Sequence, residues 1–241
     1  MIRNRLKELM AERGLKASRV ANDIENLSRN TINSTVNNNG KMIQFETVNS
    51  LCQYLGVTPN EFFEYLPFDV DVSISSDNEL VVNYPDSEPL SASIAPFYLN
   101  LYLKKVSTNQ ASGTTSKTFE LSVILTNTID YTLAAKKFVP ENKADFVVVV
   151  GNPPRNDVNN AQVNEFNKFW NADLTAGFQQ DIRSKIISEI SSYIQNELFN
   201  RIPAMEKFGG KVNFRFDESF NTKQALNAGP VINFDGPDLP F

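Results

Sequence analysis

The sequence contains no histidine and a single cysteine, Cys52. Without histidine the chain cannot build a Ser-His-Asp or Cys-His catalytic site, and the commonest transition-metal ligand is missing. One cysteine cannot form a zinc cluster or a disulfide within the chain, and its apolar neighbours favour a small buried side chain over a reactive thiol. We therefore expect no metal, no cofactor and no enzymatic activity.

Long apolar runs are missing too. No segment approaches about 18 uninterrupted apolar residues, the length of a membrane span. The charged first residues are not followed by the apolar stretch that is typical of an export signal. Apolar residues still make up 41% of 241 residues, which is enough for two domains with cores of their own. We expect a cytoplasmic, nucleoid-associated protein with no membrane partner.

The net charge is −5, but it is unevenly distributed along the chain. Residues 1–45 carry eight Lys or Arg and four Asp or Glu, a net charge of +4, and three further acids bring residues 1–66 to +1. The rest of the chain has 15 basic and 21 acidic residues. The acidic remainder would repel phosphates, so this distribution favours nucleic-acid binding through the N-terminal segment alone.

Residues 1–66 show helical periodicity and helix-capping signals throughout, and the pattern predicts an all-α domain of five helices. Ser28 is a plausible N-cap for the third helix, and Thr58, Pro59 and Glu61 form a capping-box pattern for the fifth. The expected helices and their apolar residues are 2–13 with Ile2, Leu6, Leu9 and Met10; 16–24 with Val20, Ala21 and Ile24; about 29–36; 45–55 with Phe45, Val48, Leu51, Cys52 and Leu55; and 59–66 with Phe62, Phe63 and Leu66.

The second and third helices are separated by only a few residues, and the small Ala21 lies in the middle of the second. A small side chain there lets the third helix cross closely, with Ile32 and Val36 facing the core. The outward face of the third helix then carries short polar side chains and one arginine, which suit contacts to base edges: Arg to guanine and Asn to adenine. These residues are Ser28, Arg29, Asn30, Thr31, Asn33 and Ser34.

Three segments of residues 1–66 resemble the lambda-repressor/Cro-like (XRE-family) helix-turn-helix domain. They are IRNRLKELMAERGLKASRVANDI, LSRNTI and FETVNSLCQYLGVTPNEFFEYLP. The resemblance implies that the third helix enters the major groove of double-stranded DNA. It also implies phosphate contacts from the start of the second helix and from the loop after the third. By position, those residues are Lys16, Ser18 and Arg19, then Asn38, Asn39 and Lys41.

Residues 67–241 predict an α+β domain with an antiparallel or mixed sheet and a long C-terminal helix or helix pair. Strands are expected over 70–75, 79–84, 92–106, 119–126, 146–150 and 211–216, with Ser107–Ser116 as a polar hairpin loop and an irregular end after Ala228. Apolar residues recur every three or four positions from Val163 to Leu198, with Gly177 as a candidate break. That stripe either only covers the sheet of its own domain or also extends into a dimer contact.

Two sequence patterns of enzymes are compared with this chain by their residues: a self-cleavage site and a methyltransferase motif. Some repressors carry a self-cleaving Ser-Lys protease domain and a scissile Ala-Gly between the domains. The Ala-Gly pairs here, Ala176-Gly177 and Ala228-Gly229, both lie well inside residues 67–241 and not between the two domains. Residues 145–155, DFVVVVGNPPR, resemble the strand and Asn-Pro-Pro-aromatic motif of adenine amino-methyltransferases. Arg155 replaces the aromatic residue, and no glycine-rich loop lies upstream.

These observations predict a sequence-specific DNA-binding transcriptional regulator. The resemblance implies a repressor of phage or mobile-element type, and the weak binding of a single small module favours a homodimer on operator DNA. The acidic domain would receive an antagonist protein or a small effector. An antitoxin-like or scaffold protein that autoregulates is the alternative, and an adenine-type methyltransferase is a remote alternative.

Overall fold

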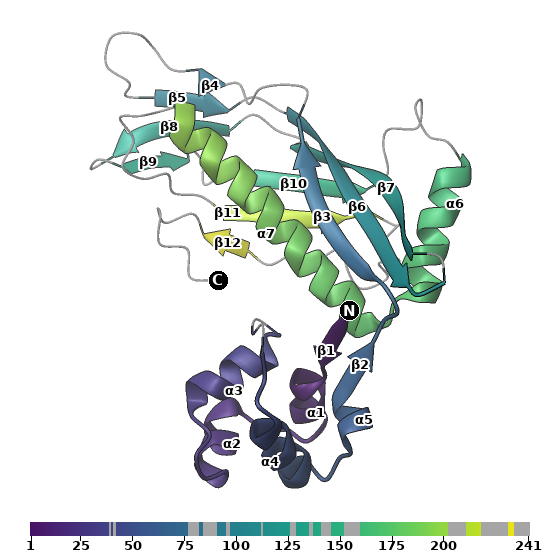
Figure 1. Cartoon of the computed structure of the whole chain (residues 1–241). Helices are drawn as coiled ribbons and strands as arrows, with labels where there is room; N and C mark the ends of the chain where they lie inside the picture. Colours follow the sequence, from purple (N-terminus) through teal and green to yellow (C-terminus); the bar gives the residue numbers. More distant parts are fainter. Residues whose placement is uncertain are drawn as a thin grey trace. The chain divides into compact units, whose positions relative to one another are not determined.

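The computed structural model describes residues 1–38, 40, 42–76, 82–83, 91–94, 97–111, 113–125, 129–134, 137–140, 146–151, 160–201, 211–217 and 231–233. The chain divides into two compact units, Met1–Asp69 and Val70–Phe241. The first is largely helical and the second combines sheets with helices (Figure 1). The predicted plan of a helical domain followed by an α+β domain is confirmed.

In the first unit, the three middle helices lie close to the ranges expected from the sequence. The helices of this unit are α1 (Leu6–Glu12), α2 (Ala17–Asp23), α3 (Arg29–Val36), α4 (Phe45–Leu55) and α5 (Pro59–Phe62). The Ser28 side chain caps α3, and Thr58 and Glu61 form a complete capping box on α5. Gly56 ends α4 at a φ of 65°, and Asn26 has a φ of 69° in the turn between α2 and α3.

The first unit is not all-α, because a two-stranded antiparallel sheet joins its ends. Strand β1 (Ile2–Asn4) pairs with β2 (Phe63–Tyr65). The expected first helix therefore starts four residues later, and Ile2, predicted on its apolar stripe, is 71% exposed. The fifth helix is a single turn, since Phe63 leaves it to enter β2.

The core of the first unit is built from one face of each helix. Leu6, Val20, Ile32, Leu51 and Phe62 are all at most 1% exposed. The prediction for Phe45 was wrong: it opens α4 on the outward side and is 93% exposed. Val48, Leu51, Cys52 and Leu55 of the same helix are buried as predicted.

The second unit contains two sheets among its described strands. The larger has the order β12-β11-β10-β7-β6-β3, and the smaller has the order β4-β5-β8-β9. Their bounds are β3 (Asp69–Ser75), β4 (Val82–Asn83), β5 (Ser91–Ile94), β6 (Phe97–Asn109), β7 (Gly113–Leu125), β8 (Ile129–Ala134), β9 (Lys137–Pro140), β10 (Phe146–Gly151), β11 (Lys211–Phe216) and β12 (Val231–Asn233). Because β10 and β11 are parallel and β6, β7 and β10 are antiparallel, the larger sheet is mixed.

Between β10 and β11 the chain forms α6 (Asn160–Lys168), a π-helical turn (Phe169–Asp173) and α7 (Ala176–Arg201). The break falls at Leu174 and Thr175, just before the predicted Gly177. Every fourth residue of α7 is fully buried, from Phe178 through Ile182, Ile186 and Ile190 to Ile194. This stripe runs along the helix that crosses the larger sheet in Figure 1, as the first of the two interpretations predicted.

Several segments of the second unit differ from the sequence expectation. The strand expected over 92–106 is divided between β5 and β6, which belong to different sheets, and β8 and β9 were not predicted. The polar residues 107–116 are mostly strand rather than loop, since Ser107 pairs with Thr115 and Asn109 with Gly113. Their Ser and Thr side chains do not alternate with apolar residues, so the sequence pattern did not predict these paired strands. Within the end that was expected to be irregular, Val231–Asn233 forms β12 against β11. Residues 152–155 of the Gly-Asn-Pro-Pro motif lie outside the described residues.

Candidate nucleic-acid interface

Helix α3 separates its side chains into an inner and an outer face. Ile32 is 1% and Thr35 is 8% exposed, and Val36 packs against the same core. Thr35 was not predicted to face inward; its Oγ1 donates to the Thr31 carbonyl at 2.8 Å, which satisfies the hydroxyl inside the fold. The outer face carries four of the predicted base-contacting residues, all exposed: Arg29, Asn30, Asn33 and Ser34.

Three of the predicted base-contacting residues, Ser28, Thr31 and Ser34, have side-chain bonds within the helix. The Ser34 hydroxyl donates to the Thr31 carbonyl at 2.9 Å. The Ser28 hydroxyl accepts from the Thr31 backbone N–H at 3.0 Å and also bonds to the Thr31 hydroxyl at 2.8 Å. Ser28 therefore works as the N-cap of α3, and Thr31 is half-buried. Within the described part of the chain, the side chains of Arg29, Asn30 and Asn33 make no hydrogen bond or ion pair, so they are the side chains best able to meet base edges.

The start of α2 presents the three predicted phosphate-contacting residues to solvent. Lys16 is the N-cap position and makes no side-chain cap bond, while Ser18 lies in the first turn. Arg19 is 70% exposed and lies 3.5 Å from Asp23 in an i,i+4 ion pair. Backbone N–H groups at a helix start, together with Lys and Arg, are suited to bind phosphate.

Helix α2 is also held from α4. The Tyr54 hydroxyl donates to the Asp23 carboxylate at 2.6 Å, and this bond raises the pKa of Tyr54 above its ordinary value. The same carboxylate faces Arg19. Asp23 therefore connects the α2 surface that would face phosphates to the body of the first unit.

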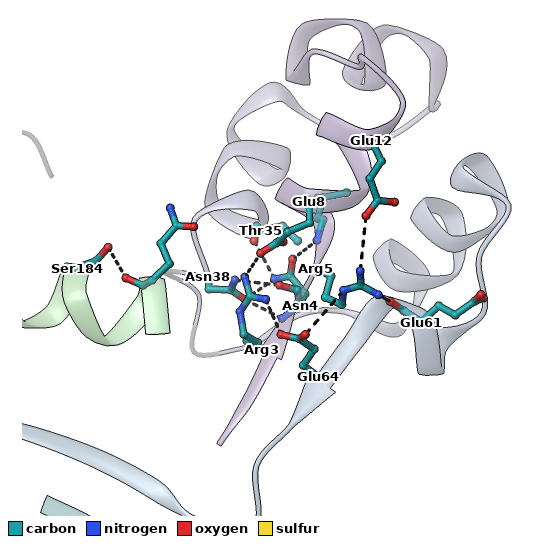
Figure 2. Close-up of polar contacts among 12 residues, drawn as sticks. Arg3, Asn4, Arg5, Glu8, Glu12, Thr35, Asn38, Glu61, Glu64 and Ser184 are labelled. Atoms are coloured by element: carbon teal, nitrogen blue, oxygen red, sulfur yellow. Dashed lines mark hydrogen bonds and ion pairs between the residues drawn. The ribbon is translucent and has the colours of Figure 1, made fainter. Parts of the chain in front are cut away.

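The loop after α3 does not offer Asn38 as a free side chain. Asn38 has a φ of 52° and turns its amide toward β1, where it bonds to the backbone of Asn4 (Figure 2). Asn39 and Lys41 lie outside the described residues. Beside this loop is a hollow of about 230 Å³ between the end of α3 and β1, with the exposed Ile2 and Met42 on its lining.

Three of the eight cations counted in residues 1–45 serve the fold of the first unit. Arg3 is 5% exposed and pairs with Glu64 at 2.6 Å and Glu8 at 2.5 Å. Arg5 lies 3.7 Å from Glu12, and the Arg13 guanidinium donates to the Leu55 carbonyl at 3.2 Å. The charge available to DNA on the described surface of α2 and α3 is thus Lys16, Arg19 and Arg29, a narrower set than the sequence suggested.

A short turn between two helices, with a polar face on the second, is the architecture of the helix-turn-helix class. Residues 5–67 match the family model of the Cro/C1-type HTH DNA-binding domain. The first unit is therefore a Cro/C1-type helix-turn-helix domain, and the protein is a DNA-binding regulator. Neither the curated proteins nor the solved structures gave a match.

Among the helices that the structure describes, none combines the length and the apolarity of a membrane span. In the described part of the chain, no group of three or more Asp, Glu or Cys side chains could hold a metal ion. The fully buried Trp170 lies 5.3 Å from the Arg183 guanidinium, and burial lowers the pKa of Arg183.

Proposed function

We propose that the protein is a transcriptional repressor that recognises operator DNA with α3. The observation that carries the proposal is the outer face of α3, where Arg29, Asn30, Asn33 and Ser34 are exposed opposite a buried face of Ile32 and Thr35. Arginine can make a bidentate bond to guanine, and asparagine can do so to adenine. Lys16 and Arg19 of α2 would fix the domain on the phosphates.

The repressor acts as a dimer in this proposal. A single domain of this size covers few base pairs, and two linked copies gain affinity because the second binding event becomes intramolecular. The second unit, Val70–Phe241, would hold two copies together and receive an antagonist protein or a small effector, with no chemistry of its own. A regulator of this kind would act in the cytoplasm on nucleoid DNA, and the family of its first unit is consistent with a phage or mobile-element origin.

The test is binding of the full chain to duplex DNA selected from a random library and to a scrambled duplex, at two salt concentrations. Arg29→Ala should narrow the free-energy gap between the two duplexes by about 1–3 kcal/mol. Arg29→Lys is the matched control. It keeps the positive charge, so the affinity for the scrambled duplex should not change. It lacks the planar guanidinium that makes two hydrogen bonds to one base, so the free-energy gap between the two duplexes should narrow as well. Equal, weak binding of wild type to both duplexes would refute the proposal.

The dimer is tested separately by analytical ultracentrifugation of the full chain at micromolar concentration, with and without the selected duplex. A dimer in solution, or two copies on one palindromic duplex, is expected. A monomer under both conditions would contradict this part of the proposal and would favour the search for a different protein partner.

A further inference from the structure

Strand β1 has one edge paired to β2 and one edge facing the end of α3. The Arg5 N–H donates to the Phe62 carbonyl at 2.8 Å, and the Leu66 N–H donates to the Met1 carbonyl at 2.9 Å. In an antiparallel pair, hydrogen-bonded residues alternate with residues whose backbone groups point away from the partner strand. With Arg3 opposite Glu64, the backbone N–H and C=O of Asn4 point away from β2.

The Asn38 side chain occupies that second edge. The Asn4 N–H donates to Asn38 Oδ1 at 2.9 Å, and Asn38 Nδ2 donates to the Asn4 carbonyl at 3.1 Å. A planar side-chain amide thus takes the place that a neighbouring strand residue would fill. Aspartate could not reproduce the pairing, because it lacks the donor.

The Asn4 side chain completes the connection from its own end. Its Nδ2 donates to the Thr35 carbonyl of α3 at 2.8 Å and to Asn38 Oδ1 at 2.6 Å, while its Oδ1 accepts from the Leu6 N–H at 3.0 Å. The Thr35 carbonyl, one of the last four of α3, also accepts from the Asn38 backbone N–H at 3.1 Å. Asn4 is 8% exposed, so these bonds are sheltered from water (Figure 2).

We propose that Asn4 and Asn38, the positioning pair, set the placement of α3 on DNA. This rests on the proposed function, since it concerns the same helix. Arg29 lies six residues before Thr35, about 9 Å along the helix at the usual rise. The pair fixes the end of α3 against β1, so releasing that end lets the Arg29 and Asn33 side chains move out of register with base edges. Asn38 then acts through α3 and not as a phosphate contact.

The experiment compares Asn38→Gly with Asn37→Gly in the full chain. Glycine keeps the left-handed conformation of residue 38 without strain and removes only the amide. Asn37 is the exposed neighbour, so its replacement controls for the added backbone freedom. The probes are a duplex selected by wild type from a random library and its scrambled version, with hydrogen exchange of the Thr35–Asn37 amides measured alongside.

For Asn38→Gly we expect the selected duplex to bind about tenfold more weakly, as when one base contact is lost. Scrambled-duplex affinity and the salt dependence should be unchanged, and the Thr35–Asn37 amides should exchange faster. Asn4→Ala should give the same pattern, and Asn37→Gly should not. An equal loss on both duplexes with a shallower salt dependence would show that Asn38 contacts phosphate and would overturn the inference. So would an unchanged ratio of the two affinities. If wild type itself selects no sequence, both the proposed function and this inference fail.

Discussion

Arg3 holds two carboxylates together inside the first unit. Its guanidinium is 5% exposed and lies within 2.6 Å of both Glu8 and Glu64. Removing one member of a buried ion pair leaves the other charges desolvated and costs about 3–5 kcal/mol. We expect Arg3→Met to lower the free energy of unfolding of the first unit by about 3 kcal/mol. Cys52 is the only thiol in the sequence and is 6% exposed. Its labelling in increasing urea therefore measures the free energy of unfolding of the first unit.

Arg19→Met is the control at the same scale. It is the same substitution in an exposed ion pair, 3.5 Å from Asp23, with Arg19 70% exposed. Exposed pairs contribute less than about 1 kcal/mol because water and salt screen them. If Arg3→Met and Arg19→Met shift the Cys52 labelling midpoint equally, the buried Arg3 ion pairs are no more stabilising than the exposed Arg19–Asp23 pair, and the prediction is wrong.

At the scale of elements, the capping box of α5 predicts a pH dependence. The Glu61 carboxylate accepts from the Thr58 backbone N–H at 2.7 Å, and this bond lowers the pKa of Glu61. Because the pKa is lower in the folded state, the stabilisation is complete above the unfolded-state pKa of about 4.3 and is lost as the pH falls through the folded-state pKa. Glu61→Gln should therefore unfold more easily than wild type at pH 7, and the difference should close as the pH falls through the lowered pKa of Glu61. The unfolding of both proteins can be followed through the NMR signals of α5 in increasing urea. A difference between Glu61→Gln and wild type that stays constant with pH would contradict the prediction.

Elements with local signals could be predicted from the sequence, and those that depend on distant pairing could not. Ser28 and Thr58 are capping residues that predict where α3 and α5 begin, and the outward face of α3 follows from helical periodicity. Strand β1 has only three residues, and its partner lies at the other end of the first unit, so nothing in its neighbourhood marks it. The same holds for Asn38: its polar type predicts a solvent contact, and only the left-handed turn and the pairing with Asn4 direct it inward.

At the scale of the whole molecule, the two units have separate hydrophobic cores, and each core contains a residue that is unique in the sequence. Cys52 belongs to the cluster formed by α1 to α5. Trp170, the single tryptophan, is fully buried in the second unit, where its carbonyl accepts from Gln179 Nε2 at 2.7 Å. Thiol labelling and tryptophan fluorescence therefore report on different units of one unmodified chain.

We expect these two probes to give distinct unfolding midpoints, because each unit buries its own apolar side chains and contributes its own cooperative transition. Arg3→Met should move the Cys52 midpoint alone. Ile186→Ala is the reciprocal variant: Ile186 is fully buried on α7, and its truncation should cost about 2–5 kcal/mol and move the Trp170 midpoint alone. Coincident midpoints that shift together in both variants would mean that the units unfold as one.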